Sequence, residues 1–415
     1  MKLLNSKVLP ARRVMIPIGI GLMLSLMGDQ TLYTVLPNPD IAALAGLKLA
    51  SVGLLLGINR LTRIVTNGPV GAFYDRAPRR WLMIASIFLG AFSTLCYAFG
   101  QGFIIMLLGR ILWGFAWSGI WIGSNTMVMD ISREENRGRI SAQLSVWFLI
   151  GIAVSSFCGG LFTDLFGYRG GLFLSAGLTG LAGLIWLLFL PETRLQTIEI
   201  KEISVGQNQK FSNLPLKLSF KLSLVLFSLR FIFAGVLAST TILWLSRYVN
   251  AGINVGNFQI PLATLTGIVV AARVIFSVGG APAAGAWSDR LGRRWGLVVG
   301  LMILGSGGVY LMSLPQFWVA IIGAFMAFFA TSGVSVLISA IIGDQVRENQ
   351  RSRVLGLVFS VGDLGSALGP WVALAIIPKI GLELVYQLSA GVGIVFSLFL
   401  LRNAIGEKVY WKKTQ

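Results

Sequence analysis

Seven charged side chains stand within long apolar stretches of this sequence, where they could carry proton or anion chemistry. The acids are Asp29 and Asp363, and the bases are Arg60, Arg63, Arg110, Arg230 and Arg273. A desolvated carboxylate can take up and release a proton, and an arginine can pair with it or hold an anion. The sequence has no histidine, so any proton chemistry must fall to carboxylates.

Long apolar helices must position these charges. Of the 415 residues, 55% are hydrophobic and only 12% are charged, which excludes an ordinary soluble globule. A bilayer crossing needs about 20 apolar residues, and the chain has roughly twelve such runs. We expect the spans at residues 14–36, 49–73, 81–100, 103–128, 140–163, 171–190, 220–246, 259–287, 295–314, 317–342, 354–378 and 384–401.

The chain consists of two similar halves. The block GAFYDRAPRR at residues 71–80 returns as GAWSDRLGRR at residues 285–294, a shift of 214 residues. The same shift carries MDISREENRGR onto GDQVRENQRSR. We therefore predict an all-α integral membrane fold of twelve helices in two pseudo-symmetric six-helix bundles, as in many secondary transporters. Residues 1–193 form the first bundle, 194–219 a polar cytoplasmic linker, and 220–415 the second bundle.

The net charge of +18 follows from membrane topology, because cytoplasmic loops retain Lys and Arg. Most of the 34 basic residues fall on one side if the amino terminus is inside. Both termini are then cytoplasmic in a multi-pass protein of the cytoplasmic membrane, with no signal peptide removed. Membrane lipids are expected partners and nucleic acid is not. Cys96 and Cys158 lie within spans, so we expect two buried thiols, with no disulfide, metal or cofactor.

The repeated block resembles the cytoplasmic signature of the major facilitator superfamily, which is a glycine, an acid and Arg four and five residues later, a second glycine, and paired cations. The second copy matches fully at Gly285, Asp289, Arg290, Gly292, Arg293 and Arg294. The first copy keeps Gly71, Asp75, Arg76, Arg79 and Arg80. It has Ala77 and Pro78 where the second glycine is expected, so we predict a tighter or kinked turn there.

In the family picture, these blocks form latches that hold the outward-open state. The resemblance implies that Asp75 meets the start of helix 11 near Arg351 and Arg353. It likewise places Asp289 against helix 5 near Arg137 and Arg139.

Arg110 opens a stretch, Arg110 to Gly114, that is similar to the helix 4 pattern of proton-linked antiporters in this superfamily. At 100° per residue, Trp113, Trp117 and Trp121 lie near its face of the helix. The three tryptophans would either form the wall of a substrate cavity or pack against neighbouring helices.

Asp29 lies roughly 24 Å beyond Arg13 along helix 1. We predict that Asp29 is the proton site and that Arg110 takes part in coupling; a permanent pair of Asp29 with Arg60 or Arg63 is the alternative.

Arg230 and Asp363 each lie roughly 15 Å from the cytoplasmic ends of helices 7 and 11, so they could pair. Arg273 then lacks an obvious partner, and so does one of Arg60, Arg63 and Arg110. We place these arginines and Asp363 in the substrate cavity. The surplus of cations favours an anionic or zwitterionic substrate.

Helix 5 resembles the efflux motif of the superfamily in part. Its residues Gly151, Ser155, Ser156, Gly159 and Gly160 keep the glycines but lack the Gly-Pro pair. The shifted copy has Gly365, Gly369 and Pro370, and we expect helix 11 to bend at the proline. The missing pair weakens the indication of export.

These observations predict proton-driven export of a small amphiphilic or anionic compound by alternating access. One alternative is uptake or flipping of an anionic metabolite or lipid-linked molecule. Another is a non-transporting sensor or membrane assembly partner. An enzyme is disfavoured, because no catalytic spacing of acids or thiols and no phosphate loop occurs. The expected partners are a small-molecule substrate and protons, and we expect a monomer.

Overall fold

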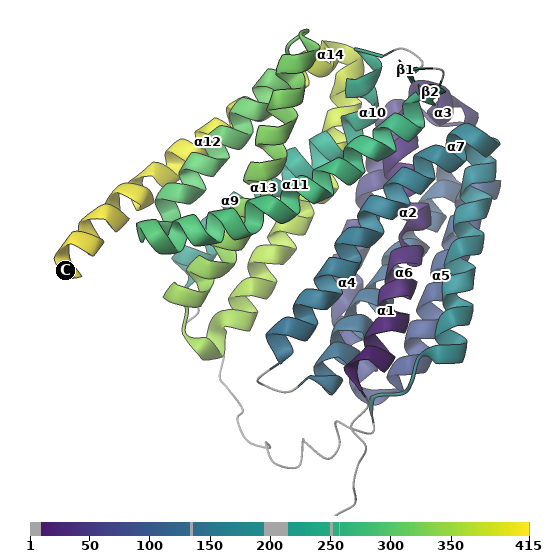
Figure 1. The fold of residues 1–415 in the computed structure, drawn as a ribbon, viewed down its shortest axis with the longest axis horizontal. Coiled ribbons are helices and arrows are strands. Elements are labelled where there is room, and N and C mark those ends of the chain that lie inside the picture. Colours follow the sequence, from purple (N-terminus) through teal and green to yellow (C-terminus); the bar gives the residue numbers. More distant parts are fainter. Residues whose placement is uncertain (1–9, 133–135, 195–214, 250–251, 257, 415) are drawn as a thin grey trace, which may run out of the picture. The chain divides into compact units, whose positions relative to one another are not determined.

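A computed structural model of the chain is almost entirely helical (Figure 1). It describes residues 10–132, 136–194, 215–249, 252–256 and 258–414, so most of the predicted linker at 194–219 lies outside the described residues. In chain order the elements are α1 (Ala11–Ser25), α2 (Met27–Val35), α3 (Pro39–Leu44), α4 (Leu49–Arg76), α5 (Arg79–Phe99), α6 (Phe103–Ile131), α7 (Arg137–Phe189), α9 (Leu216–Leu229), the π-helix η1 (Arg230–Leu237), α10 (Ala238–Ser246), β1 (Gly252–Val255), β2 (Phe258–Pro261), α11 (Leu262–Leu291), α12 (Arg294–Met312), α13 (Phe317–Gln345) and α14 (Glu348–Thr414).

The chain divides into two compact units. The first comprises Met1–Val35 and Thr62–Lys210, and the second comprises Leu36–Leu61 and Phe211–Gln415. Helix α4 therefore contributes its first half to the second unit and its last half to the first unit.

Ten helices of the described chain are long and apolar enough to cross a membrane. Helix α7 has 53 residues, or about 80 Å, which far exceeds the thickness of a hydrocarbon core. Its backbone leaves the helical region at Gly167 (φ 73°), and α14 does the same at Gly381 (φ 82°). Each glycine lies between two predicted spans, so α7 and α14 each contain two of them. Dividing both helices there would give the number of spans that the sequence predicts.

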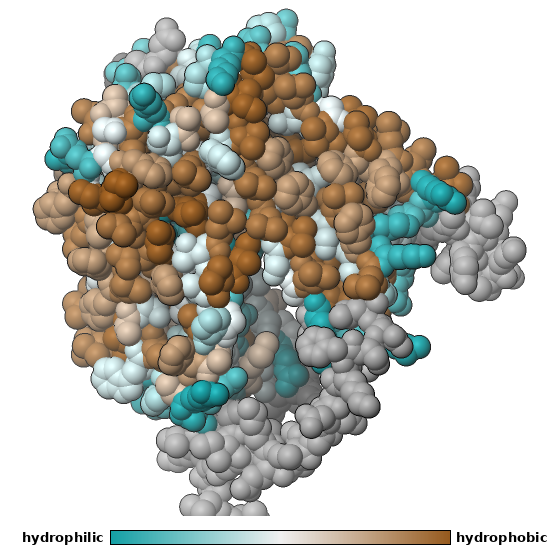
Figure 2. All heavy atoms as spheres, turned by 180° about the vertical axis from the view of Figure 1, so that it is seen from behind, coloured by the Kyte–Doolittle hydropathy of each residue, from teal (hydrophilic) through white to brown (hydrophobic). Residues whose placement is uncertain are grey.

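Each unit is a packed helical bundle. In the first unit, α1 and α2 pack on α7, and α5 packs on α6 and α7 (Figure 1). In the second unit, α12 packs on α13 and α14, and α9 and η1 pack on α14. On the face shown in Figure 2, hydrophobic side chains cover most of the coloured surface, and hydrophilic ones gather mainly toward its edges. Such a surface suits contact with lipid.

The two cysteines are free and both are only partly buried. The expectation of two buried thiols at Cys96 and Cys158 was therefore wrong. Helix periodicity places them beside the packed face and not within it, which a count of apolar residues along the chain does not reveal.

Small residues allow α14 to approach α9 and η1 closely. A methyl group at Gly369 would collide with the carbonyl oxygen of Phe231 and with the backbone of Gly235. At Gly365 it would collide with the carbonyl oxygen of Phe227. The backbone stays helical through Pro370, and the non-helical residue of α14 is Gly381. The glycines before Pro370 thus serve a helix contact.

We expect Gly369→Ala to destabilise the second unit, because the added carbon meets backbone atoms that cannot move aside, and overpacking of this kind costs about 1–3 kcal/mol. Gly391→Ala on the same helix is the matched control, since nothing lies within 4 Å of the added carbon. The control gains helix propensity and should melt at the same or a higher temperature. Thermal unfolding in detergent measures both, and equal melting temperatures would show that the contact is unimportant.

Candidate functional site

The first unit holds a buried ion pair between α2 and α6. Asp29 Oδ1 accepts a hydrogen bond from Arg110 Nη1 at 2.5 Å. The Arg110 side chain is fully buried and that of Asp29 is 10% exposed. The structure therefore brings together the two residues that the sequence analysis named for proton coupling. Each charge offsets the cost of burying the other, because isolated buried ions cost several kcal/mol each.

Local structure on three helices positions this pair. The helix is interrupted between Ser25 and Met27, which puts Asp29 in the first turn of α2, where a helix start favours negative charge. On α5, Ser93 Oγ lies 3.0 Å from the carbonyl oxygen of Gly109, one residue before Arg110. The Arg110 guanidinium carbon also lies 5.7 Å from the centre of the Tyr33 ring.

The helix 5 motif supports the same pair from α7. Ser155 Oγ donates to the carbonyl oxygen of Met23 at 3.1 Å, and Ser156 Oγ donates to Gln30 Oε1 at 3.2 Å. Gln30 Nε2 in turn lies 3.5 Å from Asp29 Oδ2. A side chain at Gly151 or Gly159 would collide with α1 or α2. The small face of α7 therefore holds the segment that carries the carboxylate.

The three tryptophans of α6 form a continuous ladder. Ring centres of Trp113 and Trp117 are 5.7 Å apart, and those of Trp117 and Trp121 are 5.9 Å apart. Phe148 of α7 contacts the last two rings at 5.7 and 5.1 Å. Trp113 and Trp117 are buried in the first unit, with Trp113 against Gly90, while Trp121 keeps intermediate exposure. The ladder is thus partly packing, and its exposed end lies at Trp121.

The second unit has its own intramembrane ion pair. Arg230 Nη1 donates to Asp363 Oδ1, and the side chains are 25% and 20% exposed. Arg230 begins the π-helix η1, and π-helical turns often occur at functional sites. Its guanidinium also lies 4.9 Å from the Phe359 ring centre. Asp363 stands just before the glycines that pack α14 on α9 and η1, so close helix packing brings this pair together.

The remaining intramembrane arginines divide between the units. Arg63 belongs to the first unit and Arg60 to the second, and both are half-buried and have interactions of their own. Arg273 on α11 lies 6.0 Å from the Phe328 ring centre and within electrostatic range of Arg60. Among the described residues, no carboxylate pairs with Arg273.

The first copy of the cytoplasmic block joins several helix ends within its unit. Arg79 Nε pairs with Asp130 Oδ2 at 3.0 Å, and Thr193 Oγ1 donates to the same oxygen at 2.7 Å. The Glu192 carboxylate accepts hydrogen bonds from the backbone N–H groups of Arg79 and Arg80, both at 3.1 Å. The ends of α5, α6 and α7 are thereby fixed to one another.

The last turn of α4 joins this network through backbone oxygens. The Arg194 guanidinium donates to the carbonyl oxygen of Arg76 and, at 3.5 Å, to that of Asp75. Within the first unit, nothing lies within 4 Å of the place that a Cβ on Gly71 would take. The predicted partners Arg351 and Arg353 belong to the other unit, so a latch at Asp75 stays a prediction.

In the second copy of the cytoplasmic block, an arginine again pairs with the aspartate that follows the next helix, but the turn differs. Arg294 pairs with Asp344 at 2.6 Å and lies 3.7 Å from Asp289. Gly292 adopts a left-handed conformation (φ 60°) that ends α11, as glycines often do after helices. Arg290 and Arg293 are exposed beside it. The latch partners predicted for Asp289, Arg137 and Arg139, lie in the first unit and stay predictions as well.

Two residues separate α4 from α5 in the first copy of the cytoplasmic block, and two residues separate α11 from α12 in the second copy. The turn in the first copy is therefore not shorter than the turn in the second. Of the two alternatives expected at Ala77 and Pro78, a tighter or a kinked turn, the tighter turn was wrong. Pro78 precedes α5 in an extended conformation (ψ 127°), which the ring of proline allows, and α5 consequently begins one position earlier in the repeat than α12.

Sequence reasoning gave no role to Asp130, Asp344, Glu192 or Thr193. The sequence did contain an indication for Asp130 and Asp344, because these two acids are related by the same shift of 214 residues as the cytoplasmic blocks. The other two follow the end of a predicted span and carry no repeat, so their partners could be found only in the structure.

Charges paired inside bundles of membrane-length helices are characteristic of membrane transport proteins. The sequence model of the Major Facilitator Superfamily matches residues 18–263 and 256–409, and the chain therefore belongs to this superfamily of transporters.

Characterised relatives and a solved structure agree with this membership. The inner membrane transport protein YajR of Escherichia coli is 24% identical over 367 residues, which cover 85% of this chain and 76% of YajR. The multidrug resistance protein MdtG of Salmonella choleraesuis is 23% identical over 364 residues, with 85% of each chain covered. A bacterial homologue of the human lysosomal transporter Spinster has a TM-score of 0.71 at 17% identity, with 97% of both chains covered.

We expect Arg110→Ala to lower the free energy of unfolding by about 3–5 kcal/mol, because it leaves the Asp29 carboxylate buried without its cation. The double variant Asp29→Asn, Arg110→Gln removes both charges and should lose much less. Thermal unfolding in detergent measures the wild type and both variants. A double variant less stable than Arg110→Ala would contradict this account of the pair.

Proposed function

We propose that this transporter exports a small amphiphilic or anionic solute across the cytoplasmic membrane by alternating access, with proton movement as the driving force. The buried Asp29–Arg110 pair is the observation that carries this proposal. It places one titratable carboxylate and one permanent cation in direct contact at membrane depth. The name of MdtG as a multidrug resistance protein supports export.

The coupling step follows from the charges of this pair. While Asp29 is ionised, its bond to Arg110 holds α2 against α6. A proton taken up by the carboxylate oxygen removes the negative charge and weakens that bond, whereas Arg110 stays cationic. The free energy of the helix contact then depends on protonation, and this dependence can bias one conformation over another. Release of the proton to the cytoplasm restores the pair.

The aromatic ladder of α6, which leads away from Arg110, suits an amphiphilic solute at its far end. Trp121 and Phe148 offer ring faces at the exposed end of the ladder. Flat apolar surfaces of this kind hold organic solutes without strict specificity. The latches at the two cytoplasmic blocks, between Asp75 or Asp289 and the opposite unit, would hold the outward-open state. Both termini would lie in the cytoplasm.

A second function, uptake or flipping of an anionic metabolite or lipid-linked molecule, is favoured by Arg273. Its guanidinium is held near Arg60 without a carboxylate among the described residues. Two neighbouring cations repel one another, and an anion between them would relieve that repulsion. An anion that approaches Asp29 would also favour protonation of the carboxylate, so the proton and the anion would travel in the same direction.

We expect Asp29→Asn to keep exchange of substrate while losing transport driven by a pH gradient. The assay uses proteoliposomes with a trapped pH dye and the compound that most stabilises the protein in a screen of anionic, cationic and neutral solutes. Asp40→Asn is the control, since Asp40 is exposed at the start of α3. Pumping that persists in Asp29→Asn removes this residue from the mechanism. Proton flow opposite to substrate indicates export, and proton flow with substrate indicates uptake.

We expect Arg273→Gln to weaken binding of acidic ligands about tenfold or more while leaving the empty protein equally or more stable. Removing a half-buried cation that has no carboxylate partner among the described residues relieves its repulsion with Arg60, whereas a purely structural arginine would lower the melting temperature when lost. Thermal shifts with acidic and neutral ligands measure both effects. Arg169→Gln, an exposed arginine, serves as the charge-matched control. An unchanged acidic shift would remove Arg273 from the anion site.

A further inference from the structure

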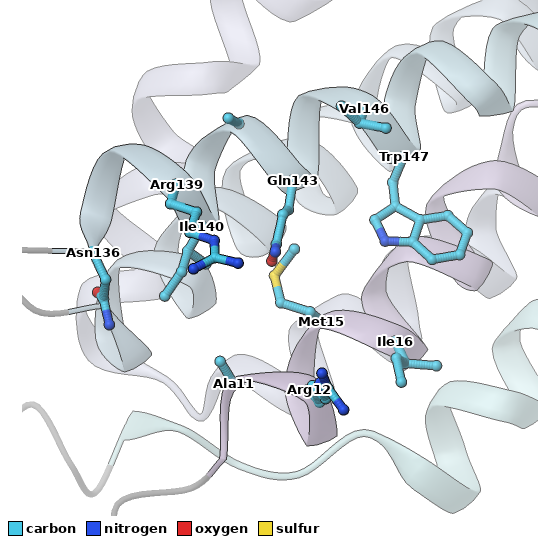
Figure 3. A pocket seen from close by; sticks show the side chains of 11 residues that line it. Ala11, Arg12, Met15, Ile16, Asn136, Arg139, Ile140, Gln143, Val146 and Trp147 are labelled. Atoms are coloured by element: carbon cyan, nitrogen blue, oxygen red, sulfur yellow. The ribbon is translucent and has the colours of Figure 1, made fainter.

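A groove of about 870 Å³ opens between the starts of α1 and α7, and neither Asp29 nor Arg110 lines it. Figure 3 shows the side chains of the residues that do. Both helices begin here, at Ala11 and Arg137, in segments that the distribution of basic residues assigns to the cytoplasmic side. The groove therefore begins at the level of lipid headgroups, and it extends along both helices toward the hydrocarbon.

The cytoplasmic end of the groove is cationic. Arg12 of α1 and Arg139 of α7 both line it, and both are exposed. Figure 3 shows the side chains of Arg139 and Gln143 reaching from α7 toward Met15 of α1. In the described part of the chain, no carboxylate forms an ion pair with either arginine. Two guanidinium groups and an amide offer donors for a phosphate group.

The inner end of the groove is apolar. Ile16 and Val146 line it and are 50% and 53% exposed. Trp147 lies over Gly19, where any side chain would collide with the indole, so the ring forms a wall at this end. From Arg139 to Trp147 the helix rises roughly 12 Å. This distance matches the passage from a headgroup to the first part of the acyl chains.

We propose that this groove binds an anionic phospholipid of the cytoplasmic leaflet, with its phosphate between Arg12 and Arg139 and its acyl chains along Ile16, Val146 and Trp147. A small soluble anion would satisfy the arginines but leave the apolar end empty. A zwitterionic lipid would bring a cation next to two arginines that form no ion pair with a carboxylate of the described residues. Only a ligand with an anionic head and apolar chains satisfies both ends.

A bound lipid would tie α1 to α7 at their cytoplasmic ends. Helix α1 leads directly to Asp29, and Ser155 and Ser156 of α7 hold the segment that carries it. Lipid in the groove would therefore stabilise the helices that position the ion pair. This binding site does not depend on the identity or direction of the transported solute.

The test compares two double variants of equal charge. Arg12→Gln, Arg139→Gln removes both groove arginines, whereas Arg13→Gln, Arg137→Gln removes exposed arginines of the same two helix ends that do not line the groove. A third variant, Ala142→Trp, fills the groove and keeps both charges. Native mass spectrometry and thermal shift in detergent measure binding of phosphatidylglycerol, phosphatidylcholine and soluble glycerol phosphate to each protein.

We expect the wild type and the Arg13, Arg137 variant to bind phosphatidylglycerol in preference to phosphatidylcholine. Each arginine near an anionic lipid surface is worth about fivefold in affinity, so the Arg12, Arg139 variant should bind phosphatidylglycerol tenfold or more weakly. Ala142→Trp should lose this binding as well. Equal losses in the two double variants would indicate general attraction to surface charge and overturn the proposal.

Two further outcomes would also overturn it. Glycerol phosphate that stabilises the protein as well as phosphatidylglycerol would show that the site takes soluble anions. Unchanged lipid binding in Ala142→Trp, together with altered distances between probes on the two units, would show that the groove receives another part of this chain.

Discussion

Charge in a medium that solvates it poorly is the constraint on which this structure depends. An ion taken out of water costs several kcal/mol unless a partner and hydrogen bonds replace its hydration. In the first unit, Asp29 and Arg110 meet this requirement almost fully buried. In the second unit, Arg230 and Asp363 meet it with a fifth to a quarter of each side chain exposed. Departures from regular helix accompany both pairs, at Leu26 and at the π-helix η1.

The two units share a scaffold but not their intramembrane charges. Asp130 and Asp344 stand at equivalent positions, and each pairs with an arginine of the cytoplasmic block in its own unit. At the same offset, the positions that correspond to Asp29 and Arg110 are Leu243 and Ala324. Duplication thus retained the contacts that fix helix ends. It did not retain the charges of Asp29 and Arg110 at the equivalent positions of the second unit.

Small residues connect this scaffold to the charges. In the first unit, the glycines and serines of α7 contact α1 and α2 beside Asp29. In the second unit, Gly365 and Gly369 of α14 contact α9 and η1 beside Arg230. Lipid offers no hydrophobic drive between helices, so close approach and hydrogen bonds must supply the packing energy. Helix packing therefore explains the glycines of the partial efflux motif in both halves, both in α7, which lacks the proline, and in α14, which has Pro370.

The sequence anticipated the helices and the duplication, and it placed Asp29 and Arg110 at a similar depth, because apolar length, repetition and helical rise can be read along one chain; the pair that it offered for Asp29 was Arg60 or Arg63, and the contact with Arg110 came from the structure. The sequence overstated the burial of Cys96 and Cys158 and missed the equal length of the two cytoplasmic turns. Those features depend on which helix face meets a neighbour and on backbone angles at Pro78 and Gly292.

By itself, the sequence determined that this protein spans the membrane as a duplicated helical bundle with a few charges at depth, since hydropathy and spacing depend only on composition and order. Tertiary structure alone decided that Ser156 and Gln30 support Asp29, that Glu192 receives the start of α5, and that Arg12 and Arg139 share one groove. These contacts join residues more than a hundred positions apart, and their geometry is set by how helices pack against one another.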